Sequence, residues 1–530
     1  MKFIRFILTI LSFVSITLGA QTTTERPRLV IGIMIDGLQQ RHIDLLWDYF
    51  DSNGFKRIIN GGAQIQNVNY NFVSAGNASD VASTMTGSVP YYHGVAGNNY
   101  YNRNNNKVQS ILFDDQEIGI GTAEKYSSHN MLSSTINDEL MMSFPEKSKS
   151  FVVAIDAEAA ILMGGHTAQS VAWIDDIKME WVTTGYFKNG LSPWADEMNV
   201  NGRFKTYISQ NWKPLYSTNT YISKSENGKK SNFNYNPTSY KSKKSKSTIL
   251  KQTPIANTLV ADLALKIITE EKLGKDNNPD MIMLQFTLLT PNEKFSLQSI
   301  EKEDMYLRLD KELQYFLQQL DSQVGKDETL VYLFGNQTDT HAPIELGENK
   351  IPAGYFNANR SMALVNSYLM AMYGQERWIE GYYAKNIFLN KRKIEEKKLD
   401  YNTIQKQVAD FMFEFEGIQA AFPVNQVMSM GGNSDSEMMR IRNSYHKNSA
   451  GDVIFTLLPG WLEVDDKNMP VGNSNSIIST TPVYFYGWKI KPQQIKNSYQ
   501  ITDIAPTLSY ILNIPFPNAN IGKPIIELFE

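Results

Sequence analysis

Residues 29–37 read LVIGIMIDG, a continuous apolar run that ends in Asp36 and Gly37. Apolar runs without alternation are typical of strands that are covered on both faces, as in parallel sheets. Similar runs follow at residues 151–155, 281–286, 330–334 and 483–486. The first run therefore predicts a buried central strand that carries an aspartate at its carboxyl end.

Segments with helical spacing of apolar residues lie between these runs, at residues 79–85, 254–273 and 300–320. Strands that alternate with helices indicate an α/β fold with a mainly parallel sheet and helices on both faces. Ligands of such sheets bind at the carboxyl ends of the strands. The residues that directly follow each apolar run are therefore the candidates for a functional site.

The composition of the chain excludes several classes of protein. The 530 residues contain 51 Lys and Arg against 55 Asp and Glu, a net charge of −4. This balance argues against a nucleic-acid binder, which needs a basic face to neutralise phosphates. The absence of cysteine excludes disulfides, a thiolate nucleophile, cysteine-ligated zinc and lipid anchoring through a cysteine.

The first twenty residues have the form of a secretory signal peptide. A short basic start precedes the apolar residues 6–18, and Gly19-Ala20 supplies small residues before a polar stretch. The apolar run is shorter than the roughly 20 residues that a spanning helix needs, which favours cleavage over a membrane anchor. We therefore predict an exported protein of the periplasm or cell envelope, with no membrane span after removal of residues 1–20.

Two stretches interrupt the alternation of strands and helices within residues 21–530. Residues 173–251 are rich in aromatic residues, Ser, Asn and Lys, and we predict an inserted cap there. Its aromatic side chains could stack a sugar or a base, or could only pack together. Residues 354–466 are predicted to form a second, irregular insertion with one helix-like segment at residues 401–415.

Asp36 and the segment of residues 74–99 are the first candidates for chemistry. A carboxylate at a strand end can bind zinc or magnesium, although an Asp-Gly pair also forms ordinary turns. Residues 74–79 read SAGNAS, a loop of small residues that enters a helix. Such a loop directs backbone N–H groups towards an anion or a nucleophile.

The motifs taken together resemble the alkaline phosphatase superfamily, in its type I phosphodiesterase/nucleotide pyrophosphatase branch. The exported alkaline phosphatases of Bacteroidetes-type bacteria are the members that the chain resembles most specifically. The matching motifs run in order from about residue 27 to the end. They include LVIGIMIDG at 29–37, TGSVP at 86–90, HG at 93–94, GNN at 97–99, YLRLD at 306–310, PGW at 459–461 and TDIAPT at 502–507.

The resemblance implies a three-layer α/β/α domain with an inserted cap, and a phosphate hydrolase with two zinc ions. One zinc ion would be held by the aspartate of the first strand, by the Thr or Ser nucleophile and by an Asp-His pair. The other would be held by an Asp and a His from an Asp-x-x-x-His segment and by a late His. Two such cations position the attacking and leaving oxygens and lower the pKa of the nucleophile.

Most positions that the resemblance assigns to this site carry other residues. The aspartate of the first strand is present as Asp36, but the nucleophile position is Asn77. The Asp-His pair is replaced by Asn336 and Gln337, and the late histidine by Thr480. An amide has no oxygen that can be deprotonated to attack phosphorus.

The Asp-x-x-x-His segment is also altered, and it is one residue short. Its two ligand positions are either Leu289 and Glu293 or Thr290 and Lys294, so no histidine is available. With Asp36 as the sole retained ligand, we expect no tight zinc site and no metal cofactor.

The phosphate-binding positions show a reversal of charge. The two basic residues that hold phosphate in the monoesterase branch are replaced by Asp156 and Glu158. A dianionic ester would meet like charges there, which is unfavourable. Asn98 matches the substrate-binding asparagine of the family. Asn98, Asp156 and Glu158 are therefore the expected remnants of the substrate pocket.

Two hypotheses follow from these substitutions. The first is a phosphatase-fold protein that has lost catalysis and acts by binding, as a structural or accessory subunit of a cell-envelope complex with a protein partner. The second is an active metal-dependent phosphate mono- or diester hydrolase with a rearranged zinc site and Ser74 or Ser79 as nucleophile. The ligands of that rearranged site would be Asp36, Glu293, Asp339 and His341. The fold alone does not decide between them, because one scaffold supports many functions.

Overall fold

The computed structural model describes residues 25–187, 190–223, 232–291, 299–336, 343–429, 431, 436–467, 471 and 479–530. The expected signal peptide, residues 1–20, lies outside the described residues. The same holds for Glu293, Gln337, Asp339 and His341. In the part of the chain that is described, no helix combines the length and the apolarity needed to cross a membrane.

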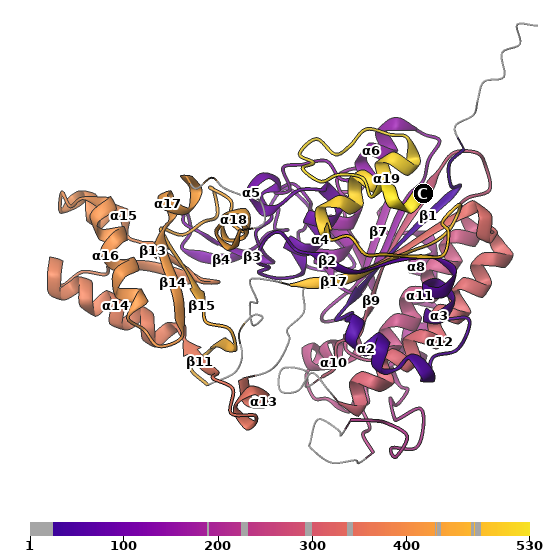
Figure 1. Cartoon of the computed structure of the whole chain (residues 1–530), viewed down its shortest axis with the longest axis horizontal. Helices are drawn as coiled ribbons and strands as arrows, with labels where there is room; N and C mark the ends of the chain where they lie inside the picture. Colours follow the sequence, from indigo (N-terminus) through magenta and orange to yellow (C-terminus); the bar gives the residue numbers. More distant parts are fainter. Residues whose placement is uncertain are drawn as a thin grey trace, which may run out of the picture.

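A mixed eleven-stranded sheet forms the centre of the larger lobe (Figure 1). Its strands, in spatial order, are β18 (Gln493–Ile495), β2 (Ala63–Asn69), β17 (Thr480–Gly487), β10 (Thr329–Gly335), β1 (Leu29–Asp36), β9 (Asp280–Thr287), β6 (Ser150–Ala154), β7 (Ser170–Ile174), β8 (Trp181–Thr184) and β5 (Gly119–Ile120), while β19 (Tyr499–Gln500) pairs with β2. Strands β10, β1, β9, β6 and β7 are parallel, and β17 joins β10 in antiparallel orientation. The apolar runs predicted from the sequence are therefore strands of this sheet.

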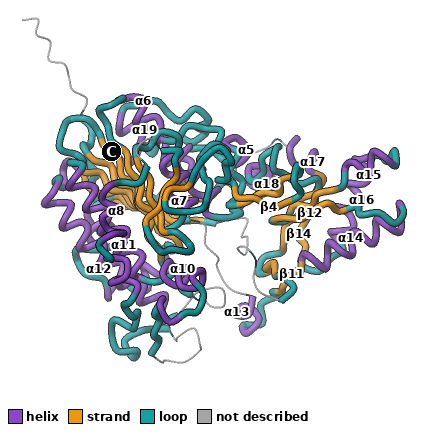
Figure 2. Tube along the Cα trace, turned by 180° about the vertical axis from the view of Figure 1, so that it is seen from behind, coloured by secondary structure: helices purple, strands orange, loops and turns teal. Residues whose placement is uncertain are grey.

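The central strand β1 is buried along all eight residues, because both faces of the sheet are covered. Ile31, Ile33 and Ile35 pack in one hydrophobic core, with α11 (Pro254–Glu270), α12 (Ile300–Gln323) and α3 (Phe55–Gly61). The alternate residues Val30 and Met34 pack in a second core, with α4 (Asn77–Thr86), α7 (Ala157–Gly164), α6 (Ile136–Ser143) and α19 (Ile504–Leu512). Figure 2 shows the sheet between these two helical layers. The predicted three-layer α/β/α architecture is confirmed.

The region predicted as an inserted cap, residues 173–251, is continuous with the main domain at its start. Residues 181–184 are strand β8 of the central sheet. The rest contains α8 (Pro193–Val200), α9 (Arg203–Ile208) and α10 (Lys243–Lys251). The aromatic side chains of Trp212 and Phe233 belong to the same core as α11 and α12. This region therefore extends one helical layer of the sandwich.

The prediction that residues 354–466 are irregular is wrong. They form a second lobe with a four-stranded antiparallel sheet, in the order β12 (Ile379–Tyr383), β13 (Asn386–Leu389), β15 (Val453–Leu457) and β14 (Ile418–Pro423). Helices α14 (Ala358–Tyr373) and α16 (Tyr401–Phe413) pack on this sheet around a separate hydrophobic core (Figure 1). Strands β12 and β14 have a mixed polar and apolar pattern, which hides them in the sequence, whereas the short apolar run of β15 was missed although it is buried throughout.

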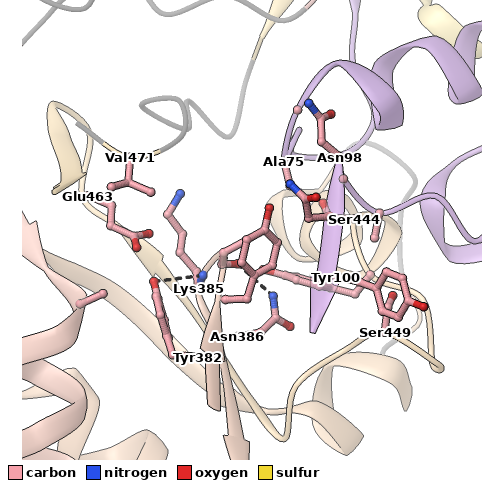
Figure 3. Close-up of a pocket in the computed structure, with 18 of the residues that line it drawn as sticks. Ala75, Asn98, Tyr100, Tyr382, Lys385, Asn386, Ser444, Ser449, Glu463 and Val471 are labelled. Carbon is pink, nitrogen blue, oxygen red and sulfur yellow. Dashed lines mark hydrogen bonds between the residues drawn. The ribbon is translucent and has the colours of Figure 1, made fainter. Parts of the chain in front are cut away.

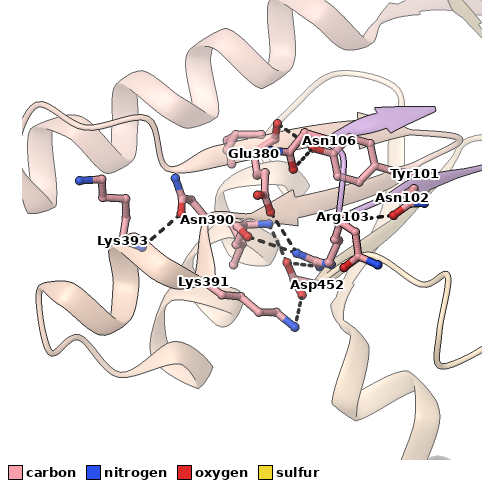
Figure 4. Close-up of polar contacts among 12 residues, drawn as sticks. Tyr101, Asn102, Arg103, Asn106, Glu380, Asn390, Lys391, Lys393 and Asp452 are labelled. Atoms are coloured by element: carbon pink, nitrogen blue, oxygen red, sulfur yellow. Dashed lines mark hydrogen bonds and ion pairs between the residues drawn. The ribbon is translucent and has the colours of Figure 1, made fainter. Parts of the chain in front are cut away.

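The two lobes are joined by a hairpin of the main domain, β3 (Asn99–Asn102) and β4 (Lys107–Ser110). The ring of Tyr101 packs against that of Phe388 with a centroid separation of 4.5 Å. Arg103, at the hairpin tip, lies 2.6 Å from the carboxylate of Asp452, which is 2% exposed (Figure 4). The hairpin therefore holds the smaller lobe through the side chains of Tyr101 and Arg103, which also bond to the backbone of Glu380 and Leu389.

Candidate functional site

The carboxyl ends of three parallel strands meet at Asp36. Strand β1 pairs with β10 on one side and with β9 on the other. Asp36 is the last residue of β1, Gln285 lies near the end of β9, and Asn336 directly follows β10. Asn77, the first residue of α4, completes the group. The sequence predicted this location for a site, and the structure brings Asp36, Asn77 and Asn336 together there.

The carboxylate of Asp36 accepts hydrogen bonds from three side-chain amides. The NH2 group of Asn77 lies 3.2 and 3.1 Å from the two carboxylate oxygens. The amides of Gln285 and Asn336 donate at 2.8 and 3.1 Å. Asp36 is 1% exposed. We call Asp36, Asn77, Gln285 and Asn336 the amide network.

Backbone N–H groups fix the orientation of these amides. The carbonyl oxygen of Asn336 accepts from the N–H of Gly37 at 3.0 Å, so its NH2 group faces Asp36. The same NH2 group donates to the carbonyl oxygen of Asn77 at 2.6 Å, which turns the NH2 group of Asn77 towards Asp36. These orientations follow from the hydrogen-bond partners, as amide assignments must.

Gln285 is oriented in the same way by the strand next to it. Its carbonyl oxygen accepts from the N–H groups of Ile155 and Asp156 at 2.9 and 2.8 Å, so its NH2 group must point to the carboxylates. That NH2 group contacts Asp156 at 3.3 Å in addition to Asp36. Gln285 thereby links the ends of β9 and β6.

Burial and, to a smaller extent, the negative charge of Asp156 together raise the pKa of Asp36 to about 7, against the hydrogen bonds from Asn77 and Gln285. Removal of a carboxylate from water disfavours its charged form, and a like charge nearby adds to this effect. The amides offset part of this penalty without supplying a full positive charge. Asp36 is therefore protonated more readily than an ordinary aspartate.

The two carboxylates at the expected phosphate-binding positions lie at the start of α7. Asp156 precedes the helix, and Glu158 lies in its first turn. Lys251, at the end of α10, is 3.1 Å from Asp156 and 2.5 Å from Asp176. Burial alone would lower the pKa of Lys251, but the two carboxylates more than offset this effect and raise it. The nearby cation is thus held in ion pairs.

Glu158 adds a further acidic side chain at this position. Burial and, to a smaller extent, the charge of Asp156 together raise the pKa of Glu158 to about 7. Three acidic side chains (Asp36, Asp156 and Glu158) therefore lie in one region, where Lys251 is paired with Asp156 and Lys302 lies near Gly37. An anion would meet net repulsion here.

Asn98 lies beside the amide network and stabilises the start of α4. Its carbonyl oxygen accepts from the N–H of Ala78 at 2.9 Å. A side chain at Gly76 would collide with this oxygen, at 2.4 Å, and Gly76 has a φ of 134° that favours glycine. Among the described residues the NH2 group of Asn98 has no hydrogen-bond partner.

The other predicted site residues take separate places. Ser79 is fully buried, and its hydroxyl donates to the carbonyl of Gly76 at 2.8 Å. Ser74 accepts from the N–H of Gly76 at 3.1 Å, so both hydroxyls serve the turn before α4. Thr480 is exposed at the start of β17, whereas the adjacent Thr481 bonds to Gly335. Among the described residues, Thr480 makes no hydrogen bond to the amide network.

Residues 30–484 match the sequence model of the type I phosphodiesterase / nucleotide pyrophosphatase family. The chain belongs to this family. It is 30% identical to a protein of Myroides odoratus named calcium-transporting ATPase, with 98% of this chain and 97% of that protein covered. It is 29% identical to alkaline phosphatase PafA of Elizabethkingia meningoseptica, with 97% of both chains covered.

The crystal structure of wild-type PafA superposes with a TM-score of 0.86 at 25% identity, over 96% of this chain and all of that chain. This agreement extends to the whole architecture, including both lobes. The chain is therefore an alkaline-phosphatase-fold member of the type I phosphodiesterase family, as the resemblance predicted.

The described residues at the strand ends do not fit the zinc ions that the family resemblance implies. A zinc ion needs lone pairs from imidazole, thiolate or carboxylate groups. At Asp36 the neighbours are instead NH2 groups, which have hydrogens where a cation needs lone pairs. Among the described residues, no group of three or more His, Cys, Asp or Glu side chains is arranged to hold a metal ion.

Sequence reasoning missed two residues of this site. Gln285 was included in an apolar strand run, although a single polar residue in such a run is a signal for a role at the strand end. Lys251 ends a helix of the region predicted as a cap, and nothing in the sequence connected it with Asp156. Both residues reach the site only through the three-dimensional arrangement of β9 and α10.

Proposed function

We propose that this protein is an exported alkaline-phosphatase-fold protein that has lost hydrolysis and acts by binding. The observation that carries the proposal is the amide network. The three amide NH2 groups around Asp36 satisfy the carboxylate where the family's first metal ion would need it. The proposal concerns a pseudoenzyme, with the cell envelope as its site of action.

The nucleophile position supports the proposal independently. Asn77 directs its NH2 group to Asp36, and its carbonyl oxygen accepts from Asn336. An amide oxygen that accepts a hydrogen bond carries no proton to lose and forms no phosphoryl ester. The hydroxyls of Ser74 and Ser79 are engaged in the adjoining turn.

The electrostatics of the pocket support a change of ligand. A phosphate hydrolase stabilises the charge of the transferred phosphoryl group with cations. Asp156 and Glu158 place negative charge there instead, and Lys251 is paired with two carboxylates. A phosphate dianion would therefore bind poorly even before any chemical step.

Export and an envelope partner are proposed on the amino-acid pattern of the chain. Residues 1–20 carry the basic, apolar and small-residue segments of a signal peptide. A chain without cysteine has no thiols to mispair in an oxidising compartment. A role as a structural or accessory subunit, with a protein partner and without nucleic acid, fits both features.

The test compares the wild-type protein with a variant that restores one metal site. Wild-type protein and the triple variant Asn77→Thr, Asn336→Asp, Gln337→His are purified and supplied with zinc. Both are assayed with an aryl phosphate, a phosphodiester and an aryl sulfate. We expect no turnover by the wild type and a gain of zinc in the variant, measured by elemental analysis. Turnover by zinc-loaded wild type would contradict the proposal.

The same assay addresses the rearranged hydrolase. That alternative needs Asp36 to leave its three amides and to join Glu293, Asp339 and His341, which lie outside the described residues. If the wild type turns over substrate, Asp339→Asn and His341→Gln should abolish the activity. If they leave the activity unchanged, the rearranged site is wrong as well.

A further inference from the structure

A large cavity lies between the two lobes, next to the amide network. Its volume is about 500 Å³, within the roughly 300–1,000 Å³ of small-molecule sites. The main domain contributes the loop of residues 73–76 and residues 96–100, including Asn98. The second lobe contributes the hairpin turn at residues 382–386 and Glu463 (Figure 3). Cavities between lobes are common ligand sites.

The hairpin turn at this cavity is strained. Ala384 and Lys385 connect β12 to β13 with φ angles of 46° and 64°. Turns of this kind normally use Asn or Gly, because the left-handed conformation costs other residues roughly 1–2 kcal/mol each. Backbone strain of this kind concentrates at ligand sites. The turn therefore presents Tyr382, Tyr383 and Lys385 to the cavity at the expense of local stability.

Aromatic rings supply the apolar part of the lining. Tyr100 comes from β3, and Tyr382 and Tyr383 come from the end of β12. Each ring is partly buried. A tyrosine offers a flat apolar face together with a polar hydroxyl, which suits a ligand with an apolar face and several hydroxyl groups.

Polar groups without a hydrogen-bond partner among the described residues supply the polar part of the cavity lining, which can orient a ligand. The NH2 group of Asn98 and the hydroxyl of Tyr445 line the cavity and have no hydrogen-bond partner among the described residues. Glu463 is 8% exposed, and the hydroxyl of Tyr382 accepts from the N–H of Lys385 at 3.1 Å. These groups can donate to and accept from hydroxyl groups of a ligand.

The charges of the lining disfavour an anionic ligand. Lys385 is the cation of the described lining, and its charge acts on Glu463. Asp465 adds a second carboxylate. Asp156 and Glu158 lie at the neighbouring strand ends, and the charge of Glu158 acts on Tyr383 of the lining. A phosphorylated ligand is therefore repelled, whereas an uncharged ligand is not.

We propose that the cavity between the lobes binds an uncharged saccharide. Its pyranose ring stacks on the tyrosines of the lining, its hydroxyl groups donate to Glu463, and one oxygen accepts from the NH2 group of Asn98. This inference deepens the proposed binding function and rests on it, because it names the class of ligand that replaces a phosphate ester.

The experiment measures binding of glucose, galactose and N-acetylglucosamine, each beside its 1-phosphate, to the full-length mature protein. Saturation-transfer NMR detects binding, and titration calorimetry gives the affinity. We expect at least one neutral sugar to saturate the protein and its 1-phosphate to bind at least tenfold more weakly. Tighter binding of the 1-phosphate, or no saturation by any of the three sugars, would overturn the inference.

Two variants locate the site. Glu463→Gln keeps the shape of the side chain but removes the charged acceptor, and we expect roughly tenfold weaker sugar binding. Asn98→Asp keeps an oxygen for the N–H of Ala78 but removes the free donor, with a similar loss expected. Glu396→Gln, on α15 (Lys391–Glu396) of the same lobe, is the matched control and should bind like the wild type.

Circular dichroism and thermal unfolding establish whether each variant is folded. If Glu463→Gln does not fold, the sugar affinity of Asn98→Asp decides the test. Unchanged sugar affinity in the folded variants would overturn the assignment of the cavity. Phosphate release from a sugar 1-phosphate would refute the proposed loss of hydrolysis and leave the sugar site intact. Absence of sugar binding without phosphate release would refute only the sugar site.

Discussion

The amide network and the cavity between the lobes are neighbours, yet they use polar side chains in opposite ways. Around Asp36, each amide is satisfied by another protein group, and orientation is fixed by backbone N–H groups. In the cavity, Asn98 and Tyr445 have polar groups without a partner among the described residues. A site whose polar groups already bond to one another has few donors or acceptors available for a ligand. A site with unpaired polar groups retains its capacity to bind.

This difference gives a physical meaning to the proposed loss of a catalytic centre. In a dinuclear metal site, the lone pairs of the carboxylates and imidazoles are available to bind cations. Replacement by amides turns the same strand ends into a closed structural network. In the proposed function, binding capacity lies in the neighbouring cavity, outside the position that the family resemblance assigns to a metal ion.

The largest expected effect comes from breaking the closed network at Gln285. Gln285→Leu removes the donor to Asp36 and the acceptor of two backbone N–H groups; two of these hydrogen bonds are buried, and the one from Asp156 is partly buried. We expect a loss of about 3–5 kcal/mol in the free energy of unfolding, measured with urea. Gln318→Leu on the exposed face of α12 is the matched control. A loss below about 1 kcal/mol would mean that the network is not structural.

The pH dependence of stability probes the acidic side of the network. The pKa values of Asp36 and Glu158 are raised to about 7 from 3.8 and 4.5. Between these lower and upper pKa values, the folded protein therefore binds more protons than the unfolded chain. The stability should therefore be highest at about pH 4 and should fall as the pH rises to about 7, as far as these two groups contribute. Denaturation with urea across this range measures the slope.

Glu158→Gln isolates one of the two groups. It should flatten the fall between about pH 4.5 and 7 by roughly 2–3 kcal/mol, because the glutamine does not titrate. Glu396→Gln, an exposed carboxylate on α15, should leave the slope as it is. An identical slope in Glu158→Gln and wild type would show that Glu158 has no raised pKa.

An intermediate effect is expected where the main-domain hairpin holds the cavity lobe. Arg103 pairs with the buried Asp452 and lies over the ring of Phe388 at 4.8 Å (Figure 4). Arg103→Met keeps the apolar stem but leaves Asp452 with fewer partners, which should destabilise the lobe by about 1–2 kcal/mol. Hydrogen exchange at the amide of Leu389, which donates to Asp452, reports this directly.

The control for that change is Arg392→Met, whose guanidinium pairs with Glu396 on the exposed face of α15. It should leave exchange at Leu389 as in the wild type. Faster exchange in both variants would show that the lobe responds to any loss of positive charge, and not to the contact at Asp452.

The smallest expected effect concerns the strained turn. Ala384→Gly relieves a left-handed conformation that alanine tolerates poorly. We expect a gain of about 0.5–1 kcal/mol in stability, less than the full relief because glycine loses more entropy on folding. Ala363→Gly on α14 is the control and should destabilise the lobe. A loss of stability in Ala384→Gly would indicate that the turn is not strained.

The sequence predicted the central architecture because strands buried on both faces have unmistakable apolar runs. The runs at residues 29–35, 151–155, 281–286, 330–334 and 483–486 all lie in strands of the main sheet. Part of the second lobe was missed for the opposite reason, although its strand β15 is an apolar run that is buried throughout. Its strand β12 reads IEGYY and is fully buried only at Ile379, so its pattern is that of a polar segment.

Most residues of the candidate site could be predicted from the sequence, but the hydrogen bonds that join them could not. Asp36, Asn77 and Asn336 could be grouped because strand ends and the family motifs point to one place. The role of Gln285 and the direction of each amide depend on N–H groups from Gly37, Ile155 and Asp156, which only the folded backbone brings close. The exposed position of Thr480 at the start of β17 likewise follows from the strand's register with β2.

The most direct test of the account is a zinc titration of the wild-type protein by calorimetry, after removal of metal with a chelator. If the amides hold Asp36 as the structure indicates, zinc should not bind in a stoichiometric amount, and unfolding in urea should be the same with and without zinc. Saturable binding of one or two zinc ions per chain, with a rise in stability, would contradict the account.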